Sequence, residues 1–264
     1  MQTSGLTKVF RWQGDESEHA DDIIAGEVAV AMTYNKMSHV VMMATPADLE
    51  DFALGFSLTE RIITAPQLLL STRVIPREQG IEVAMTVPPD IAEDIRLKRR
   101  NLTGRTGCGL CGAETLEQAL RYPDPVANQL RISHAALQQA IAALSRHQPL
   151  QAATGAVHGA AFCNAQGEVL AAREDVGRHN ALDKLIGHLV RAGIDPATGF
   201  VMVTSRASYE MVYKTAAAGI ELMVAVSAPT TLAVEFAMHC GLTLIGFARP
   251  GRHNVYTHPE RIQE

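Results

Sequence analysis

Residues 200–247 read FVMVTSRASYEMVYKTAAAGIELMVAVSAPTTLAVEFAMHCGLTLIGF, and this stretch decides the fold class. Three short apolar runs alternate in it with two longer segments of helical character. Apolar runs of this length are typical of strands that are buried on both faces. The alternation predicts a layered α/β sheet with parallel segments, with strands at 200–204, 221–227 and 242–247 and helices at 208–218 and 231–240.

The segments just before this stretch extend the same sheet. Strands are expected at 157–163 and 168–172 around a polar turn, and a helix at 180–191. Ser133 is placed to cap an earlier helix that carries an apolar stripe. Because sheets of this kind bind ligands at the carboxyl ends of their strands, we expect the site among the polar clusters that stand there.

The first 90 residues have a different pattern, made of strands and one helix. Runs at 25–34 and 39–45 predict a hairpin, and two more strands are expected at 68–75 and 81–87. Thr45, followed by proline and three acidic residues, predicts the N-cap of the single helix. We therefore expect an N-terminal β-rich subdomain (1–95), a glycine-rich loop with a short helix (96–125) and an α/β domain (126–264).

The composition narrows the class of protein. The 264 residues include 47% hydrophobic residues and carry a formal net charge of -5, which argues against holding duplex nucleic acid by bulk electrostatics. Four cysteines are too few for a disulfide scaffold. The sequence has neither a signal-peptide pattern at its start nor an apolar stretch of the roughly 18–20 residues that span a membrane. We expect a cytoplasmic protein with no membrane partner.

The first candidate for chemistry is the segment GRTGCGLCG at 104–112, which leads into an expected helix at 113–121. The pair Cys108 and Cys111 fits half of a structural zinc site, a thioredoxin-type dithiol, or a loop whose thiolate carries a covalent group to a partner. The surrounding glycines permit close approach by another molecule. The nearby cations favour an attacking thiolate because positive charge lowers the pKa of a thiol; they are Lys98, Arg99, Arg100 and Arg105.

The second candidate is the segment REDVGRHNALDK at 173–184, which spans an expected junction of strand and helix. Glu174 and Asp175 can act as acid, base or hydroxyl-binding groups, and Arg178 and His179 as anion contacts at a helix start. A plain surface helix would not require this cluster, although its last two residues, Asp183 and Lys184, can also simply decorate an exposed helix face.

Several turns of the α/β domain are weaker candidates. His158 begins a strand, and Ala160 stands where zinc deaminases carry the glutamate of their His-x-Glu signature, which argues against deamination. The hydroxyls at 204–210 and 227–231 either cap helices or help to bind phosphate. After the last strand, Arg249 and Arg252 form an anion clamp beside a Pro-Gly turn.

Taken in order along the chain, these motifs resemble the FdhD family. The residues that carry the resemblance are GCGLCG, VHGAA, REDVGRHNALDK, SRASYEM and GFARPGR. The match to the family runs in order from about residue 22 to the C-terminus. Members of this family are sulfur carrier proteins, or accessory sulfurtransferases, that formate dehydrogenase requires for activity. A CxxC pair alone would be weak evidence, but the Glu-Asp-Val-Gly-Arg-His-Asn segment together with it is specific.

The resemblance implies a function and a site. Cys108 would accept persulfide sulfur from a cysteine desulfurase, and Cys111 would assist or resolve the transfer. The sulfur would pass to the molybdenum (or tungsten) bis-guanylyl pterin cofactor before it enters formate dehydrogenase. The cofactor, or a GDP-like nucleotide in its place, would bind at Phe247, Ala248, Arg249, Pro250, Gly251 and Arg252.

The resemblance further implies a cytoplasmic homodimer whose main domain has a mixed sheet of the cytidine-deaminase-like type. The protein would hold no catalytic metal of its own, and Asp175, Arg178 and His179 would support the pocket without assigned roles. Two other functions stay open: a non-catalytic chaperone that escorts the cofactor, and a dithiol oxidoreductase that cycles a Cys108–Cys111 disulfide.

Overall fold

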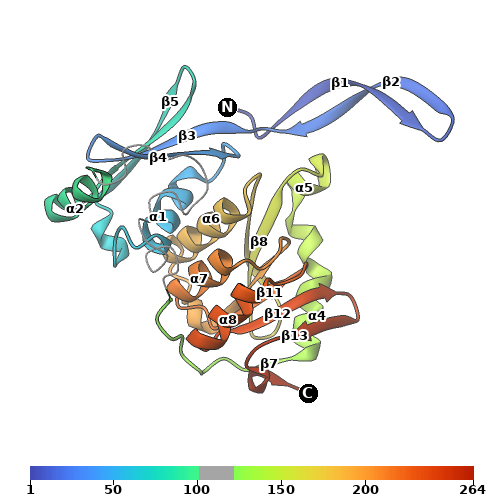
Figure 1. Ribbon diagram of the computed structural model, residues 1–264. Coiled ribbons are helices and arrows are strands. Elements are labelled where there is room, and N and C mark those ends of the chain that lie inside the picture. The colour runs from blue at the N-terminus through green and yellow to red at the C-terminus, as the bar shows by residue number, and fades with distance from the viewer. Residues whose placement is uncertain (101–121) are drawn as a thin grey trace.

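The computed structural model describes residues 1–100 and 122–264, and the side chains of residues 98–100 are not described. The CxxC pair and the helix expected at 113–121 therefore lie outside the described residues. Figure 1 shows an α/β body, a smaller layer of strands and helices packed on it, and a long two-stranded arm.

The body is built on one six-stranded mixed sheet with the strand order β13-β12-β11-β10-β8-β9. The three strands β10, β11 and β12 run parallel to one another, while the pairings of β8, β9 and β13 are antiparallel. The strands are β8 (His158–Asn164), β9 (Val169–Asp175), β10 (Gly199–Val203), β11 (Leu222–Ala225), β12 (Thr243–Arg249) and β13 (Arg252–Val255).

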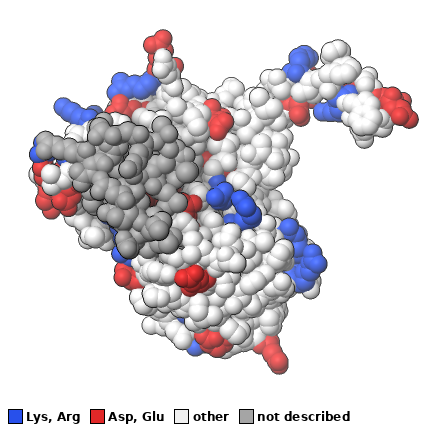
Figure 2. Space-filling model, in the orientation of Figure 1, with Lys and Arg blue, Asp and Glu red and all other residues white. Residues whose placement is uncertain are grey.

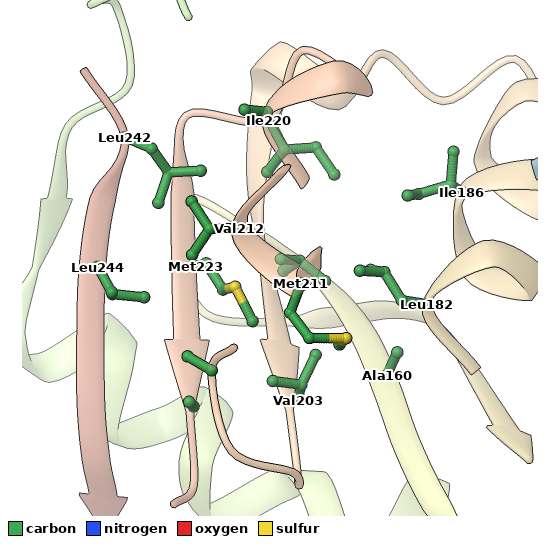
Figure 3. Close-up of a cluster of buried hydrophobic side chains, with 14 of the residues drawn as sticks. Ala160, Leu182, Ile186, Val203, Met211, Val212, Ile220, Met223, Leu242 and Leu244 are labelled. Carbon is green, nitrogen blue, oxygen red and sulfur yellow. The ribbon is translucent and has the colours of Figure 1, made fainter. Parts of the chain in front are cut away.

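Helices cover both faces of this sheet, as its apolar strands require. One face packs against α6 (Arg178–Arg191), α7 (Tyr209–Ala217) and α8 (Thr231–Cys240), and Figure 3 shows part of the core between them. The other face packs against α4 (His134–Ala143). Alternate strand residues enter the two cores, Met223 on the first side and Leu222 on the second.

The N-terminal layer is a four-stranded sheet with the order β4-β3-β6-β5. The strands are β3 (Val28–Tyr34), β4 (Met37–Ala44), β5 (Ser71–Arg77) and β6 (Gly80–Thr86). Two helices, α1 (Leu49–Thr59) and α2 (Pro89–Arg100), pack on one face of this sheet and form a third core with it.

The remaining elements are short, except for the arm. The arm is a hairpin of β1 (Ser4–Gln13) and β2 (Glu16–Ala25) that forms a sheet of its own. The short elements are η1 (Pro66–Leu68), η2 (Leu144–His147), η3 (Pro196–Thr198), η4 (Pro259–Arg261), α5 (Pro149–Thr154), and the paired strands β7 (Ile132–Ser133) and β14 (Ile262–Gln263).

The N-terminal layer is joined to the body where α1 crosses α6. A Cβ atom added at Gly55 would lie 1.7 Å from the carbonyl oxygen of Asp183, and one at Gly187 would lie 1.9 Å from that of Asp51. Only glycine allows two helix backbones to approach this closely. The two layers therefore form one packed unit.

Most of the expected elements are confirmed, with boundaries that differ by a few residues. The α8 helix has the predicted bounds, and Ser133 caps α4 by accepting a hydrogen bond from the backbone N–H of Ala136 at 3.1 Å. The α/β class with mixed sheets is confirmed. The cytidine-deaminase-like type stays a prediction.

Three features of the N-terminal region differ from expectation. Thr45 is not the N-cap of α1, because the helix begins after Asp48 and the Thr45 hydroxyl accepts the N–H of Val176. Pro89 starts a second helix, α2, whereas the sequence predicts only one helix in the N-terminal subdomain. Proline favours the first turn of a helix, which lacks partners for its N–H groups in any case. The hairpin β1–β2 was not expected at all.

Candidate functional site

The parallel strands bring three turns together at one edge of the central sheet. The turns after β10, β11 and β12 all lie at this carboxyl edge. Ala207 and Pro229, in the first two turns, form an isolated bridge, and the N–H of Phe247 donates to the carbonyl of Ser227 at 3.0 Å. The segments that the sequence singled out after these strands therefore form one continuous surface.

The expected cofactor-binding residues 247–252 form the hairpin turn between β12 and β13. Phe247 has a left-handed backbone with φ 53° and is half exposed, while Ala248 is buried. The Arg249 guanidinium donates to the carbonyl oxygens of Val226 and Ala248. Arg249 pairs directly with Arg252 across the hairpin, and both are exposed. Residues that pair directly point to one face of the hairpin, so two positive charges stand side by side.

The charge of this turn is not compensated by neighbouring acids. Neither Arg249 nor Arg252 forms an ion pair with any carboxylate among the described residues. Like charges placed together repel each other, and an anion that binds between them removes this cost. The turn has the chemistry of a phosphate-binding site, and Pro250 and Gly251 shape it.

Gln138 of α4 holds this turn through two side-chain contacts. Its side-chain oxygen accepts the N–H of Gly251 at 2.7 Å, and its amide nitrogen lies 3.0 Å from Nδ1 of His253. His253 Nε2 in turn lies 2.9 Å from Nδ1 of His134. In sequence Gln138 looks like an ordinary polar residue on a helix surface, so only the tertiary structure reveals its contact.

A second cluster lies further along the same edge, where α6 and α7 begin. His158 on β8 lies opposite Asp175 on β9 in the register of the two strands. Nε2 of His179 lies 2.9 Å from a carboxylate oxygen of Glu210. Burial lowers the pKa of His158, and the positive charge of Arg178 lowers it further. The contact with His179 lowers the pKa of Glu210. The cluster thus holds a neutral His158 beside a cation.

Two polar atoms of this cluster are buried and have neither a hydrogen bond nor an ion-pair contact among the described residues. They are Nε of Arg178 and Oγ of Ser208, the N-cap residue of α7. By contrast, Thr230 caps α8 by accepting the N–H of Ala233. The start of α7 therefore has hydrogen-bonding capacity left for a ligand, whereas the hydroxyl that caps α8 is already used.

The surroundings of Asp175 indicate a structural role and not that of a catalytic acid or base. It is fully buried, lies 2.6 Å from Nζ of Lys184, and accepts the N–H of Thr45 at 3.0 Å. The side-chain amide of Asn180 also donates to it. Asp175 therefore joins the end of β4 to α6 instead of facing a substrate.

The prediction that the last two residues of this segment, Asp183 and Lys184, decorate an exposed helix face is wrong. Both Asp183 and Lys184 are buried, and Asp183 pairs with Lys214 at 2.9 Å. Burial raises the pKa of Asp183 although Lys214 opposes this. The neighbouring Glu174 accepts the N–H groups of Leu150 and Gln151 at the start of α5, which is also a structural role.

The structure bears on one alternative for the cysteines, although Cys108 and Cys111 lie outside the described residues. Cys163 and Cys240 are buried in cores on opposite faces of the central sheet. The two thiols therefore cannot bind the same zinc ion, and they do not complete a four-ligand site with the CxxC pair. Burial raises the pKa of Cys163 to about 12 and also raises that of Cys240. These two thiols therefore stay protonated.

The described part of the chain contains neither a cluster of three metal-binding side chains nor a helix that is long and apolar enough to cross a membrane. A cavity of about 420 Å³ lies at the ends of α1, α6 and α7 and is lined by residues that include Leu58, Ile186 and Ala217. None of the expected site residues lines it, so the cavity is separate from the carboxyl edge.

Comparison with known proteins identifies the class to which this fold and edge belong. The sequence model of the FdhD/NarQ family matches residues 25–263, so the chain belongs to this family. The chain is 51% identical over 261 residues to the "Sulfur carrier protein FdhD" of Cupriavidus necator, covering 99% of this chain and 91% of the relative. It is 52% identical over 259 residues to the protein of the same name from Xanthomonas campestris, covering 98% and 92%.

A solved structure agrees with this assignment. It is that of a protein from Desulfotalea psychrophila that is proposed to be a formate dehydrogenase accessory protein. The two structures superimpose with a TM-score of 0.77 at 25% sequence identity, and the match covers 99% of this chain and 100% of the other.

Proposed function

We propose that this chain is a sulfur carrier that formate dehydrogenase requires for activity. The observation that carries the proposal is the sequence identity of about 51% over nearly the whole chain to proteins named as sulfur carriers. The CxxC pair at Cys108 and Cys111 supplies the thiols that such a carrier needs.

The proposed chemistry begins with capture of sulfur. The Cys108 thiolate attacks the outer sulfur of a persulfide on a cysteine desulfurase, and the desulfurase cysteine leaves as a thiolate. The new S–S bond replaces the old one, so no net oxidation takes place. Cys111 then attacks the inner sulfur of the Cys108 persulfide, which forms a Cys108–Cys111 disulfide and releases sulfide to the cofactor. A dithiol reductant resets the pair.

The turn at 247–252 is the proposed binding site for the guanylyl cofactor that receives this sulfur. The uncompensated pair Arg249 and Arg252 suits its phosphates, and the exposed ring of Phe247 offers a face for a base to stack upon. A GDP-like nucleotide carries the same groups and would occupy the same turn. The start of α7, with its free Ser208 hydroxyl, offers a further phosphate contact at this edge.

The remaining parts of the proposal concern partners and place. A cysteine desulfurase donates the sulfur, formate dehydrogenase receives the finished molybdenum or tungsten cofactor, and the carrier acts as a homodimer in the cytoplasm. The deaminase-like sheet would serve here to bind a nucleotide and not to hold a catalytic zinc ion, since Ala160 replaces the glutamate of the deaminase signature.

Intact mass spectrometry tests sulfur capture directly. The protein is incubated with a cysteine desulfurase and cysteine, and the wild type is compared with Cys108→Ala and Cys111→Ala. We expect a gain of one sulfur that Cys108→Ala abolishes and Cys111→Ala retains. If no form gains sulfur while formate dehydrogenase still depends on the protein, the chaperone function replaces this proposal. A Cys108–Cys111 disulfide that turns over small disulfides without sulfur capture would indicate the oxidoreductase.

Calorimetric titration with GDP tests the turn separately. We expect Arg249→Ala and Arg252→Ala each to weaken binding by about tenfold or more, as for loss of a charged hydrogen-bonding partner. Arg73→Ala, an exposed arginine on β5 of the N-terminal layer, is the matched control and should leave the affinity unchanged. Equal affinities in all four proteins would exclude the turn as the nucleotide site.

A further inference from the structure

The arm exposes an apolar face that no described residue covers. Residues that pair across an antiparallel ribbon point to the same side, and the register pairs Leu6 with Ile23 and Phe10 with His19. Trp12 lies on this side too, because it is two residues from Phe10. The exposed fractions are 71% for Leu6, 66% for Phe10, 69% for Trp12 and 42% for Ile23. Figure 2 shows the outer part of the arm standing clear of the body, although β2 also contacts α5.

Such an arm has little stability of its own. A two-stranded hairpin alone in water is marginally stable at best, and each large aromatic side chain buries about 150–250 Å² when it packs. The charged residues on this face are paired with each other, since Lys8 lies 2.6 Å from Asp21. The face is therefore apolar and close to neutral, and it fits another apolar surface better than a strongly charged one.

The same chain offers a second open apolar surface next to the arm. Val41 and Met43 of β4 are 59% and 50% exposed, on the face of the N-terminal sheet opposite to α1. They pair with Ala31 and Ala29 of β3, whose small side chains leave this face flat. We refer to these four residues as the open sheet face. It follows the arm directly, because β2 leads into β3.

The arm cannot reach the open sheet face of its own chain. Only Gly26 and Glu27 separate β2 from β3. The N–H of Gly26 donates to the carbonyl of Thr3 at 2.7 Å, and a Cβ at Gly26 would lie 2.3 Å from the carbonyl oxygen of Gln2. The ribbon is therefore packed backbone against backbone at this joint. Folding the arm back would break that pairing and reverse both strands within two residues.

We propose that the arm packs on the open sheet face of a second copy of this chain, so that two copies exchange arms about a two-fold axis. Each copy then contributes one arm and one open sheet face, which makes the interface self-complementary as two-fold symmetry requires. The arm is long enough for this contact, since ten residues per strand extend over roughly 33 Å. This inference rests on the homodimer proposed above and is independent of sulfur transfer.

Sedimentation equilibrium of the full chain tests the contact. The double variant Phe10→Ser/Trp12→Ser should raise the dimer dissociation constant by roughly 100-fold, because it removes two aromatic anchors of the interface. The control Thr7→Ala/Arg11→Ala changes the opposite face of β1 and should leave the constant unchanged. Circular dichroism at high dilution checks that the body remains folded in both variants.

A mixing experiment identifies which surfaces meet. The variant Val41→Ser/Met43→Ser should also dissociate, and mixing it with Phe10→Ser/Trp12→Ser should restore dimers to part of the wild-type level. One intact contact remains in such a mixed pair. It joins the unchanged arm of Val41→Ser/Met43→Ser to the unchanged open sheet face of Phe10→Ser/Trp12→Ser. Arms that packed only on each other would make the sheet variant dimerise normally, which would overturn the exchange.

Tryptophan fluorescence of the wild type reports the arm contact without any mutation, because Trp12 is the single tryptophan of the chain. Its emission should shift to shorter wavelength as the wild type dimerises and return on dilution. A dimer in which Trp12 stays solvent-exposed would refute the arm contact but leave the homodimer standing. A chain that is monomeric at every concentration would refute both. Sulfur capture by Cys108 is measured by mass on the same samples, and its result does not depend on whether the arm contact forms.

Discussion

At the scale of single residues, the buried charges of α6 hold the N-terminal layer on the body. Lys184 lies 2.6 Å from Asp175 and donates to the carbonyl of Thr45, while Lys214 of α7 contacts both Asp183 and Thr59. Removing one partner of a buried ion pair leaves the other charge buried and uncompensated. This lowers the stability of the protein by much more than the intact pair contributed. These residues therefore set how firmly the two layers stay together.

We expect Asp175→Asn to lower the free energy of unfolding by about 3 kcal/mol, because Lys184 would remain buried without its counter-charge. Urea unfolding measures the loss. The control is Asp124→Asn, which breaks the exposed pair with Arg61 and should change the stability by less than about 1 kcal/mol. Equal effects of the two variants would show that Asp175 does not have the structural role inferred here.

His253 makes the stability of the site depend on pH. Burial lowers the pKa of its imidazole, and the neighbouring His134 lowers it further. The folded protein thus keeps His253 neutral at a pH where the unfolded chain, with a value near 6.5, already binds a proton. The stability that this residue contributes is present above that pH and is lost as the pH falls through it.

The expected result is that the free energy of unfolding falls less steeply between pH 7.5 and 5.5 in His253→Asn than in the wild type. Urea unfolding at a series of pH values gives both slopes, and above pH 7.5 the two curves should run parallel. If the slopes agree throughout the range, His253 titrates alike in the folded and unfolded chains.

At the scale of elements, the crossing of α1 and α6 depends on two glycines. Alanine normally stabilises a helix interior by about 1 kcal/mol relative to glycine. At Gly187, however, the added Cβ would overlap the main-chain carbonyl of Asp51, which cannot move without moving α1. We expect Gly187→Ala to destabilise the protein by about 2 kcal/mol or more in thermal unfolding. Gly5→Ala, where no atom lies within 4 Å of the added Cβ, is the control and should have little effect.

The elements also show where sequence reasoning succeeds and where it stops. Local signals determine the α8 helix and the Ser133 cap, and the sequence predicts both. Thr45 has an equally good local signal, but its hydroxyl is used in a contact with Val176, 131 residues away in sequence. Gln138 has no local signal for its bond to Gly251. Residues whose partners are distant in sequence are the ones that such reasoning misassigns.

The arm is a case of a different kind. Its strands alternate exposed apolar residues with charged ones, such as Phe10 with Arg11, and no core among the described residues includes the apolar side. A pattern search looks for a buried face, and the residues that the structure describes supply none for the arm. The interaction that would stabilise the arm lies between molecules.

At the scale of the whole molecule, the close crossing of α1 and α6 and the buried ion pairs make the N-terminal layer and the body depend on each other. The core of the N-terminal layer and the cores of the body are separate clusters, yet Asp51 of α1 pairs with both Arg173 and Arg191 across the boundary. Loss of either layer would leave these charges and the facing helix surfaces in contact with water.

We therefore expect the two layers to unfold together in one cooperative transition. Hydrogen exchange followed by mass spectrometry in rising urea should give the same free energy of opening for peptides of β3 and β6 as for peptides of β10 and β11. The variant Asp175→Asn/Gly187→Ala weakens the boundary and should let the N-terminal peptides open first, with the body still protected. If the wild type already opens in two steps, the boundary contacts are too weak to couple the layers. Peptides of the arm should exchange before either layer at concentrations below the dimer dissociation constant, because a lone hairpin is only marginally stable.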